Sequence, residues 1–95
     1  MTENIVQRAE ILLQQKRFND AEKLLTNLLA TNPSDIHILT LLSEANLQQN
    51  KIEVAETLLN SAIGLSTESS HLYYNKARIA IKRDQYDEAE KFLKQ

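Results

Sequence analysis

The sequence predicts an all-α fold: an α-α superhelix, or solenoid, of about three antiparallel helix pairs, with the third pair truncated. The first observation is a nine-residue segment that recurs every 34 residues and places Ala21, Ala55 and Ala89 at equivalent positions. The second is helical spacing of the apolar residues between these recurrences. The third is that 95 residues contain one Gly and one Pro, which suits long helices joined by short loops. A fixed period of this length indicates one helical pair stacked on copies of itself.

Other positions of the segment keep the same 34-residue period. They are Phe18, Ile52 and Tyr86; Glu22, Glu56 and Glu90; and Leu25, Leu59 and Leu93. We therefore expect a single repeat domain over residues 1–95, with repeats of about 2–35, 36–69 and 70–95. Because the third copy stops inside its second helix, we expect the chain to be part of a longer protein.

The first helix pair is predicted over residues 3–15 and 18–30, with a break at Lys16. Pro33 ends the second of these helices, because proline cannot donate a hydrogen bond in a helix interior. Ser34 is then the predicted N-cap of the next helix, with Asp35 in its first turn.

The other two pairs follow the same plan. We expect helices over residues 35–49, 52–65, 68–82 and from 86 to the end. Asn50 is the predicted turn residue of the second pair, because Asn tolerates the left-handed conformation. In the third pair we expect the first helix to pack on the second through Tyr73, Ala77 and Ala80. The residues expected to meet them on the second helix are Ala89, Phe92 and Leu93.

Small residues recur where two crossing helices come closest. Ala9, Ser43 and Ala77 are small on the first helices, and Ala21, Ala55 and Ala89 are small on the second helices. The large residues Phe18, Ile52 and Tyr86 are predicted to fill the space beside them.

Composition and charge exclude several classes of function. A net charge of −2 argues against a nucleic-acid surface, which needs a cationic stripe. No apolar run reaches the roughly 20 residues that span a bilayer. The absence of Cys removes thiolate metal sites and thiol nucleophiles. No secretory signal is visible, so we expect a cytoplasmic location.

At these positions the chain resembles the tetratricopeptide repeat family, whose 34-residue signature is W-x2-L-G-x2-Y, A-x3-F and P. The three copies read Ile5-x2-Arg8-Ala9-x2-Leu12 with Ala21-x3-Leu25 and Pro33; Leu39-x2-Leu42-Ser43-x2-Asn46 with Ala55-x3-Leu59; and Tyr73-x2-Lys76-Ala77-x2-Ala80 with Ala89-x3-Leu93. Arg8 and Lys76 replace the usual Leu, Asn46 replaces the aromatic residue, and Thr67 replaces the Pro. The resemblance covers essentially the whole chain.

The resemblance implies a scaffold that binds a peptide or a partner helix in a concave groove lined by the first helix of each pair. It places five sets of equivalent residues, which we call ladders, in that groove: Glu3/His37/His71, Val6/Thr40/Tyr74, Glu10/Glu44/Arg78, Leu13/Leu47/Ile81 and Gln14/Gln48/Lys82. The groove is then expected to be acidic toward the first two repeats and basic in the third, with an apolar rail along Leu13, Leu47 and Ile81. A complementary peptide would carry an apolar anchor and basic residues toward the first repeat.

Self-association is the alternative function. A solenoid exposes an apolar end unless a polar cap covers it. The candidate residues for a homodimer contact are Ala89, Phe92 and Leu93.

Other kinds of site are not expected. The ladder Glu3/His37/His71 offers metal-ligand types, but neighbouring first helices lie about 8–10 Å apart, which strains shared ligation. No phosphate-binding loop, nucleophile elbow or His-Glu-x-x-His pattern is present, so we expect no cofactor, no bound metal and no enzyme activity.

Overall fold

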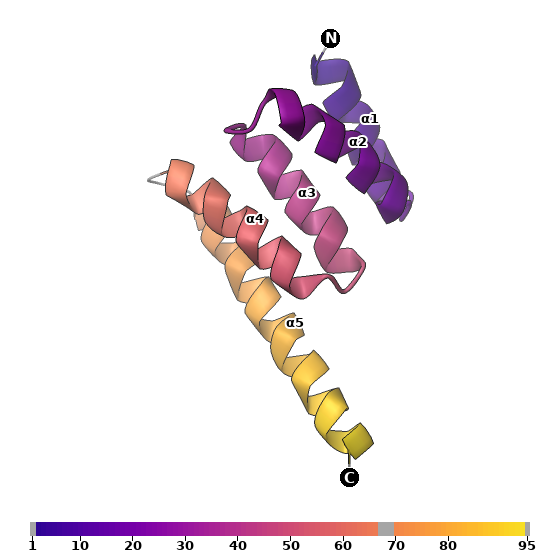
Figure 1. Ribbon diagram of the computed structural model, residues 1–95, viewed down its shortest axis with the longest axis vertical. Coiled ribbons are helices and arrows are strands. Elements are labelled where there is room, and N and C mark those ends of the chain that lie inside the picture. The colour runs from indigo at the N-terminus through magenta and orange to yellow at the C-terminus, as the bar shows by residue number, and fades with distance from the viewer. Residues whose placement is uncertain (1, 67–69, 95) are drawn as a thin grey trace.

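The protein is a stack of helices (Figure 1). The computed structural model describes residues 2–66 and 70–94, with side chains described except at positions 2–3, 70–71, 86 and 88–94. Its helices are α1 (Thr2–Gln14), α2 (Phe18–Thr31), α3 (Ile36–Gln48), α4 (Ile52–Leu65) and α5 (Ser70–Lys94). The described residues contain no strand, which agrees with the predicted all-α superhelix.

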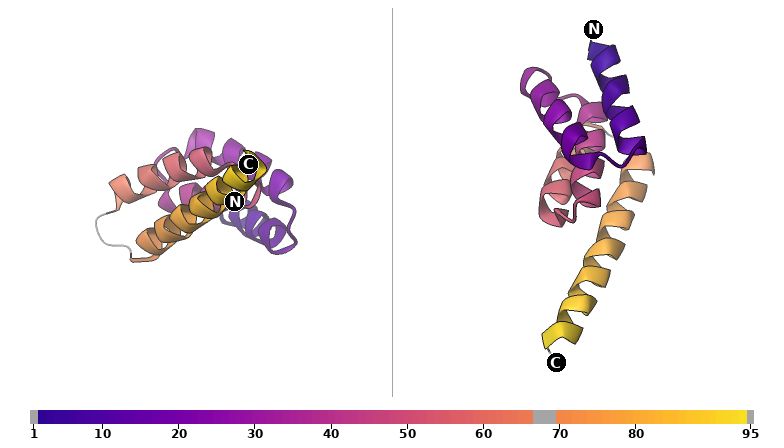
Figure 2. Two further views of the ribbon diagram at one scale, coloured as in Figure 1. Left: turned by 90° about the horizontal axis from the view of Figure 1, so that it is seen from below. Right: turned by 90° about the vertical axis from the view of Figure 1, so that its right-hand side faces the viewer.

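Each helix packs on the next one along the chain, from α1 on α2 to α4 on α5. The molecule measures 52 × 30 × 20 Å. Figures 1 and 2 show that the C-terminal half of α5 accounts for much of the length, because it runs past the end of α4 and away from the other helices.

The turns inside the first two pairs have the same geometry. Lys16 and Asn50, 34 residues apart, have positive φ angles of 63° and 64°. Residues 46–47 accept backbone hydrogen bonds from Asn50 and Lys51, just as the residues 34 positions earlier do in the first turn. The predicted break at Lys16 and the predicted left-handed Asn50 are confirmed. The repeat in sequence is therefore also a repeat in backbone conformation.

The start of α3 differs from the prediction by one residue. Asp35, not Ser34, is the N-cap: its backbone is extended, and its Oδ1 accepts a hydrogen bond from the Ile38 N–H at 3.1 Å. Ser34 lies in the turn that follows Pro33. The carboxylate satisfies one of the free N–H groups and faces the positive end of the helix.

Two apolar clusters form the core. The first joins α1, α2 and α3 and includes the fully buried Ala9, Ala21 and Leu25. The second joins α3, α4 and α5 and includes the fully buried Ala55 and the nearly buried Leu59. The small residues predicted for the first two pairs are therefore in the core.

The third pair is not a hairpin. The predicted turn at residues 83–85 is helical, and α5 runs continuously from Ser70 to Lys94. Tyr73, Ala77 and Ala80, predicted to face a second helix, are exposed. The α5 helix instead packs on the rest of the core through Leu72 and Ile79. The predicted partners Ala89, Phe92 and Leu93 have side chains outside the described part of the chain.

The charges around position 84 give a physical reason for the straight helix. In the first two turns a cation follows the left-handed residue and pairs with α2: Arg17 with Asp20 at 2.7 Å, and Lys51 with Glu22 at 3.0 Å. The third copy has the neutral Gln85 at that place. Arg83, two residues before Gln85, pairs with Glu56 of α4 at 3.3 Å while remaining helical.

Candidate binding groove

The first helices α1, α3 and α5 are linked by polar side-chain contacts between residues far apart in sequence. Glu10 of α1 contacts His37 of α3, with 2.9 Å between Oε1 and Nε2. Glu44 of α3 contacts Arg78 of α5. These contacts bring four of the predicted ladder residues together across three helices: Glu10, His37, Glu44 and Arg78.

The Glu44–Arg78 pair is two-pronged. Arg78 Nη1 and Nη2 donate to the two carboxylate oxygens at 3.1 and 3.2 Å, and Gln48 Nε2 donates to Oε1 at 2.9 Å. Burial raises the pKa of Glu44, but the hydrogen bonds from Gln48 and Arg78 and the charges of Arg78 and Lys82 outweigh it, so the pKa lies below its ordinary value. Glu44 therefore stays ionised, and bidentate pairing fixes it against α5.

The remaining ladder residues vary in exposure. Five of them are half-buried: Val6, Leu13, Thr40, Gln48 and Lys82. Two are exposed, Gln14 and Tyr74. The side chains of Glu3 and His71 lie outside the described part of the chain.

The predicted charge pattern needs a correction. Glu44 does not offer free negative charge, because Arg78 compensates it. Glu10 keeps the acidic character of the first repeat and pairs with His37, which is charged only when protonated. The surface charge of the second repeat is thus closer to zero than predicted.

The predicted apolar rail is not continuous at the surface. Leu47 is only 4% exposed and belongs to the second core cluster, while Leu13 packs against the first. Ile81 is 59% exposed, and Tyr74, seven residues earlier and about two turns away on the same helix, is 64% exposed. Accessible apolar surface therefore concentrates on α5.

A shallow hollow of about 240 Å³ lies beside Ile81. Its walls come from the end of α3 and the middle of α5: Leu47, Gln48, Arg78, Ile81, Lys82 and Gln85. It combines apolar surface with two cationic side chains.

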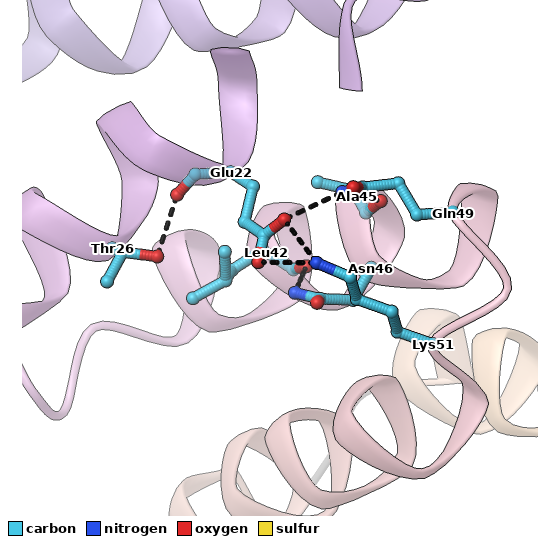
Figure 3. A network of polar contacts seen from close by, with 7 residues as sticks. All are labelled: Glu22, Thr26, Leu42, Ala45, Asn46, Gln49 and Lys51. Atoms are coloured by element: carbon cyan, nitrogen blue, oxygen red, sulfur yellow. Dashed lines mark hydrogen bonds and ion pairs between the residues drawn. The ribbon is translucent and has the colours of Figure 1, made fainter. Parts of the chain in front are cut away.

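A second polar network, on the other side of α3, was not predicted (Figure 3). Glu22 of α2 accepts hydrogen bonds from Gln49 Nε2 at 2.8 Å and Lys51 Nζ at 3.0 Å. Beside it, the buried Asn46 donates to the Leu42 carbonyl at 2.8 Å. The spacings of 27 and 29 residues between Glu22 and its partners could have suggested contact between adjacent repeats.

Acid is expected to weaken the Glu22 network. Hydrogen bonds from Gln49 and then Lys51 lower the pKa of Glu22 below its ordinary value of 4.5. A lowered folded-state pKa gives stability that is present above the unfolded pKa and lost as pH falls through the folded pKa. We expect Glu22→Gln to lower stability near neutral pH by on the order of 1 kcal/mol or less, and the loss to vanish below the folded pKa. Urea unfolding at pH 7 and pH 3 measures this difference.

Glu53→Gln, at an exposed position of α4, is the matched control. A loss for Glu22→Gln that is equal at both pH values, or equal to that of Glu53→Gln, would contradict the assigned role of Glu22.

Among the residues described, no group of three or more His, Cys, Asp and Glu side chains could hold a metal ion. No helix in this part of the chain is both long enough and apolar enough to cross a bilayer.

Comparison with known proteins gives one family. The model of the tetratricopeptide repeat family matches residues 12–64 and 47–95. The two matched segments begin 35 residues apart (47 − 12), within one residue of the repeat period. Comparisons with curated proteins and with solved structures found no match.

Proposed function

Because the chain belongs to the tetratricopeptide repeat family, whose repeats are generally protein–protein interaction modules, we propose that α1, α3 and α5 form a groove that binds a peptide or a partner helix. The family typically provides scaffolds rather than enzymes. The single observation that supports this groove most is the exposed apolar surface of Tyr74 and Ile81 next to the paired Arg78.

The hollow beside Ile81 suits an apolar anchor of the ligand. Large apolar side chains of a partner gain most when they are removed from water in such a pocket. Arg78 is already oriented by Glu44, so its guanidinium does not have to be ordered when the ligand binds.

The charges along the groove favour one direction of the ligand. Arg78 and Lys82 on α5 outnumber Glu44 beside them, whereas Glu10 lies at the α1 end. A ligand with basic residues toward α1 and acidic residues toward α5 would be complementary.

A peptide selection tests the groove. Peptides displayed on phage are selected against the protein, and the affinity of a selected peptide is measured by fluorescence anisotropy. We expect Ile81→Asp to weaken binding about tenfold or more, because it puts a charge against the apolar anchor.

Val54→Asp is the matched control, since Val54 is also an exposed aliphatic residue but lies on the second helix α4. Glu10→Lys tests the direction and should weaken binding of peptides with a basic end. If Ile81→Asp and Val54→Asp bind the selected peptides equally well, the groove is not the binding surface.

A further inference from the structure

The face of α5 that carries Tyr73, Ala77 and Ala80, which we call the uncovered face, lacks the helix that covers its equivalents. In the second repeat the same positions are Leu39, Ser43 and Asn46. All three are buried, whereas Tyr73 is 58% exposed and the two alanines are exposed as well.

The contact that is missing can be described from the second repeat. Ser43 Oγ donates to the Ala55 carbonyl at 2.8 Å, so α3 and α4 approach closely at this point. Ala77 corresponds to Ser43, and Ala89 corresponds to Ala55. Two small residues at these places permit an equally close approach.

The helix that would complete the contact is present in the sequence. Tyr86, Ala89, Phe92 and Leu93, whose side chains lie outside the described part of the chain, correspond to Ile52, Ala55, Leu58 and Leu59 of α4. These residues are on the C-terminal half of the same straight α5, which extends away from the stack (Figure 2). A continuous helix cannot fold back on itself, so this half does not reach the uncovered face of its own chain.

We infer that the uncovered face is filled by the C-terminal half of α5 from a second copy of this chain. Exchange of an identical element between copies is a low-cost route to association, because every contact is one that the repeat already encodes. This association is distinct from the proposed groove binding, since it uses a different face of α5.

Charge favours this pairing. Residues 70–84 of α5 contain four cations and one anion, whereas residues 85–94 contain three anions and two cations. Antiparallel pairing of α5 from two copies places the anionic half of one against the cationic half of the other. Such complementarity favours association of unlike halves over like halves.

The geometry of α5 decides the size of the assembly. Positions 77 and 89 lie 12 residues apart, which is about 120° around a straight α-helix. Because α5 is continuous through residues 83–85, the two positions lie on different sides of it, and the exchange continues from one copy to the next. The assembly is therefore larger than a monomer and grows with concentration.

Light scattering after gel filtration, over a wide concentration series, tests the association. We expect the wild-type protein to form oligomers. Ala77→Glu should lower their association constant about tenfold, because the charge would be buried in the contact. Ile11→Glu is the matched control, since Ile11 is an exposed apolar residue at the other end of the stack. Circular dichroism checks that both variants keep their helices. A monomer at every concentration would overturn the inference.

A cysteine pair tests which chain supplies the covering helix, since the protein has no cysteine of its own. Ala77→Cys and Ala89→Cys chains, one of them carrying a mass tag, are mixed under mild oxidation. A disulfide forms only when the two Cα atoms come within about 7 Å. We expect the mixed, cross-linked pair; a disulfide within single chains that carry both substitutions, and none between chains, would overturn the inference.

The double change Asp84→Asn with Gln85→Lys adds an independent readout. It reproduces the Asn50-Lys51 turn of the second pair and gives Glu56 the partner that Glu22 has in Lys51. We expect this variant to bend back within its own chain and become monomeric. Unchanged oligomers would show that the straight α5 is not what drives association.

Discussion

Leu59→Ala is expected to destabilise the protein by about 2–5 kcal/mol, the cost of removing a buried leucine side chain and leaving a cavity. Leu59 is 1% exposed on α4 and belongs to the cluster that contains Leu39 of α3 and Leu72 and Ile79 of α5. The substitution thus weakens packing of α4 on both neighbouring helices. Small domains have only about 5–15 kcal/mol of stability, so much of the chain should unfold at lower urea concentration.

Leu65→Ala provides the comparison for Leu59→Ala. Leu65 is at the end of the same helix but is 48% exposed, so the same chemical change should cost much less. Equal urea midpoints for the two variants would show that Leu59 does not join α3 to α5 as described.

Ala55→Leu is expected to destabilise the protein by about 1–3 kcal/mol or more, through overpacking. Ala55 is fully buried, and its carbonyl accepts the 2.8 Å hydrogen bond from Ser43 Oγ that holds α3 close to α4. A larger side chain must separate the two helices or displace residues around it. A thermal melt measures the loss.

Val54→Leu, at the exposed neighbouring position, controls for the change in side-chain size along α4. If the Ala55→Leu variant has the same melting temperature as the wild type, the close approach of α3 and α4 is not required for stability.

Much of the fold could be predicted because it depends on local signals that repeat. The 34-residue period, the stop at Pro33 and the left-handed turn at Asn50 each act over a few residues, and each matches the structure. Small residues at Ala9, Ala21 and Ala55 likewise indicated buried positions.

The third pair could not be predicted from the same signals. The sequence of residues 86–89 matches the start of the second helix in the other repeats. The first turn of a helix and its interior favour similar residues, however, so this match does not decide whether a new helix begins there. The outcome depends on contacts of the residues just before them, such as Arg83 with Glu56 of the preceding repeat. Such contacts depend on three-dimensional placement, which a repeat pattern does not contain.

For the candidate groove, the sequence predicted some contacts between helices but not the burial of individual side chains. Ladder spacing placed Glu44 next to Arg78, and the two are in contact. It did not predict that Leu47 would be withdrawn into the core, because adjacent positions on one helix face can differ greatly in burial. The contact of Glu10 with His37 crosses from one ladder to another, which the ladder spacing did not predict.

Two leucines belong to the surroundings of both apolar clusters. Leu29 of α2 and Leu58 of α4 each pack against the cluster around Leu25 and also against the cluster around Leu59. In linear arrays of repeats, the free energy of contact between neighbouring units sets how cooperatively they unfold. Shared leucines therefore couple the two halves, so that α1 to α4 should melt as one thermodynamic unit.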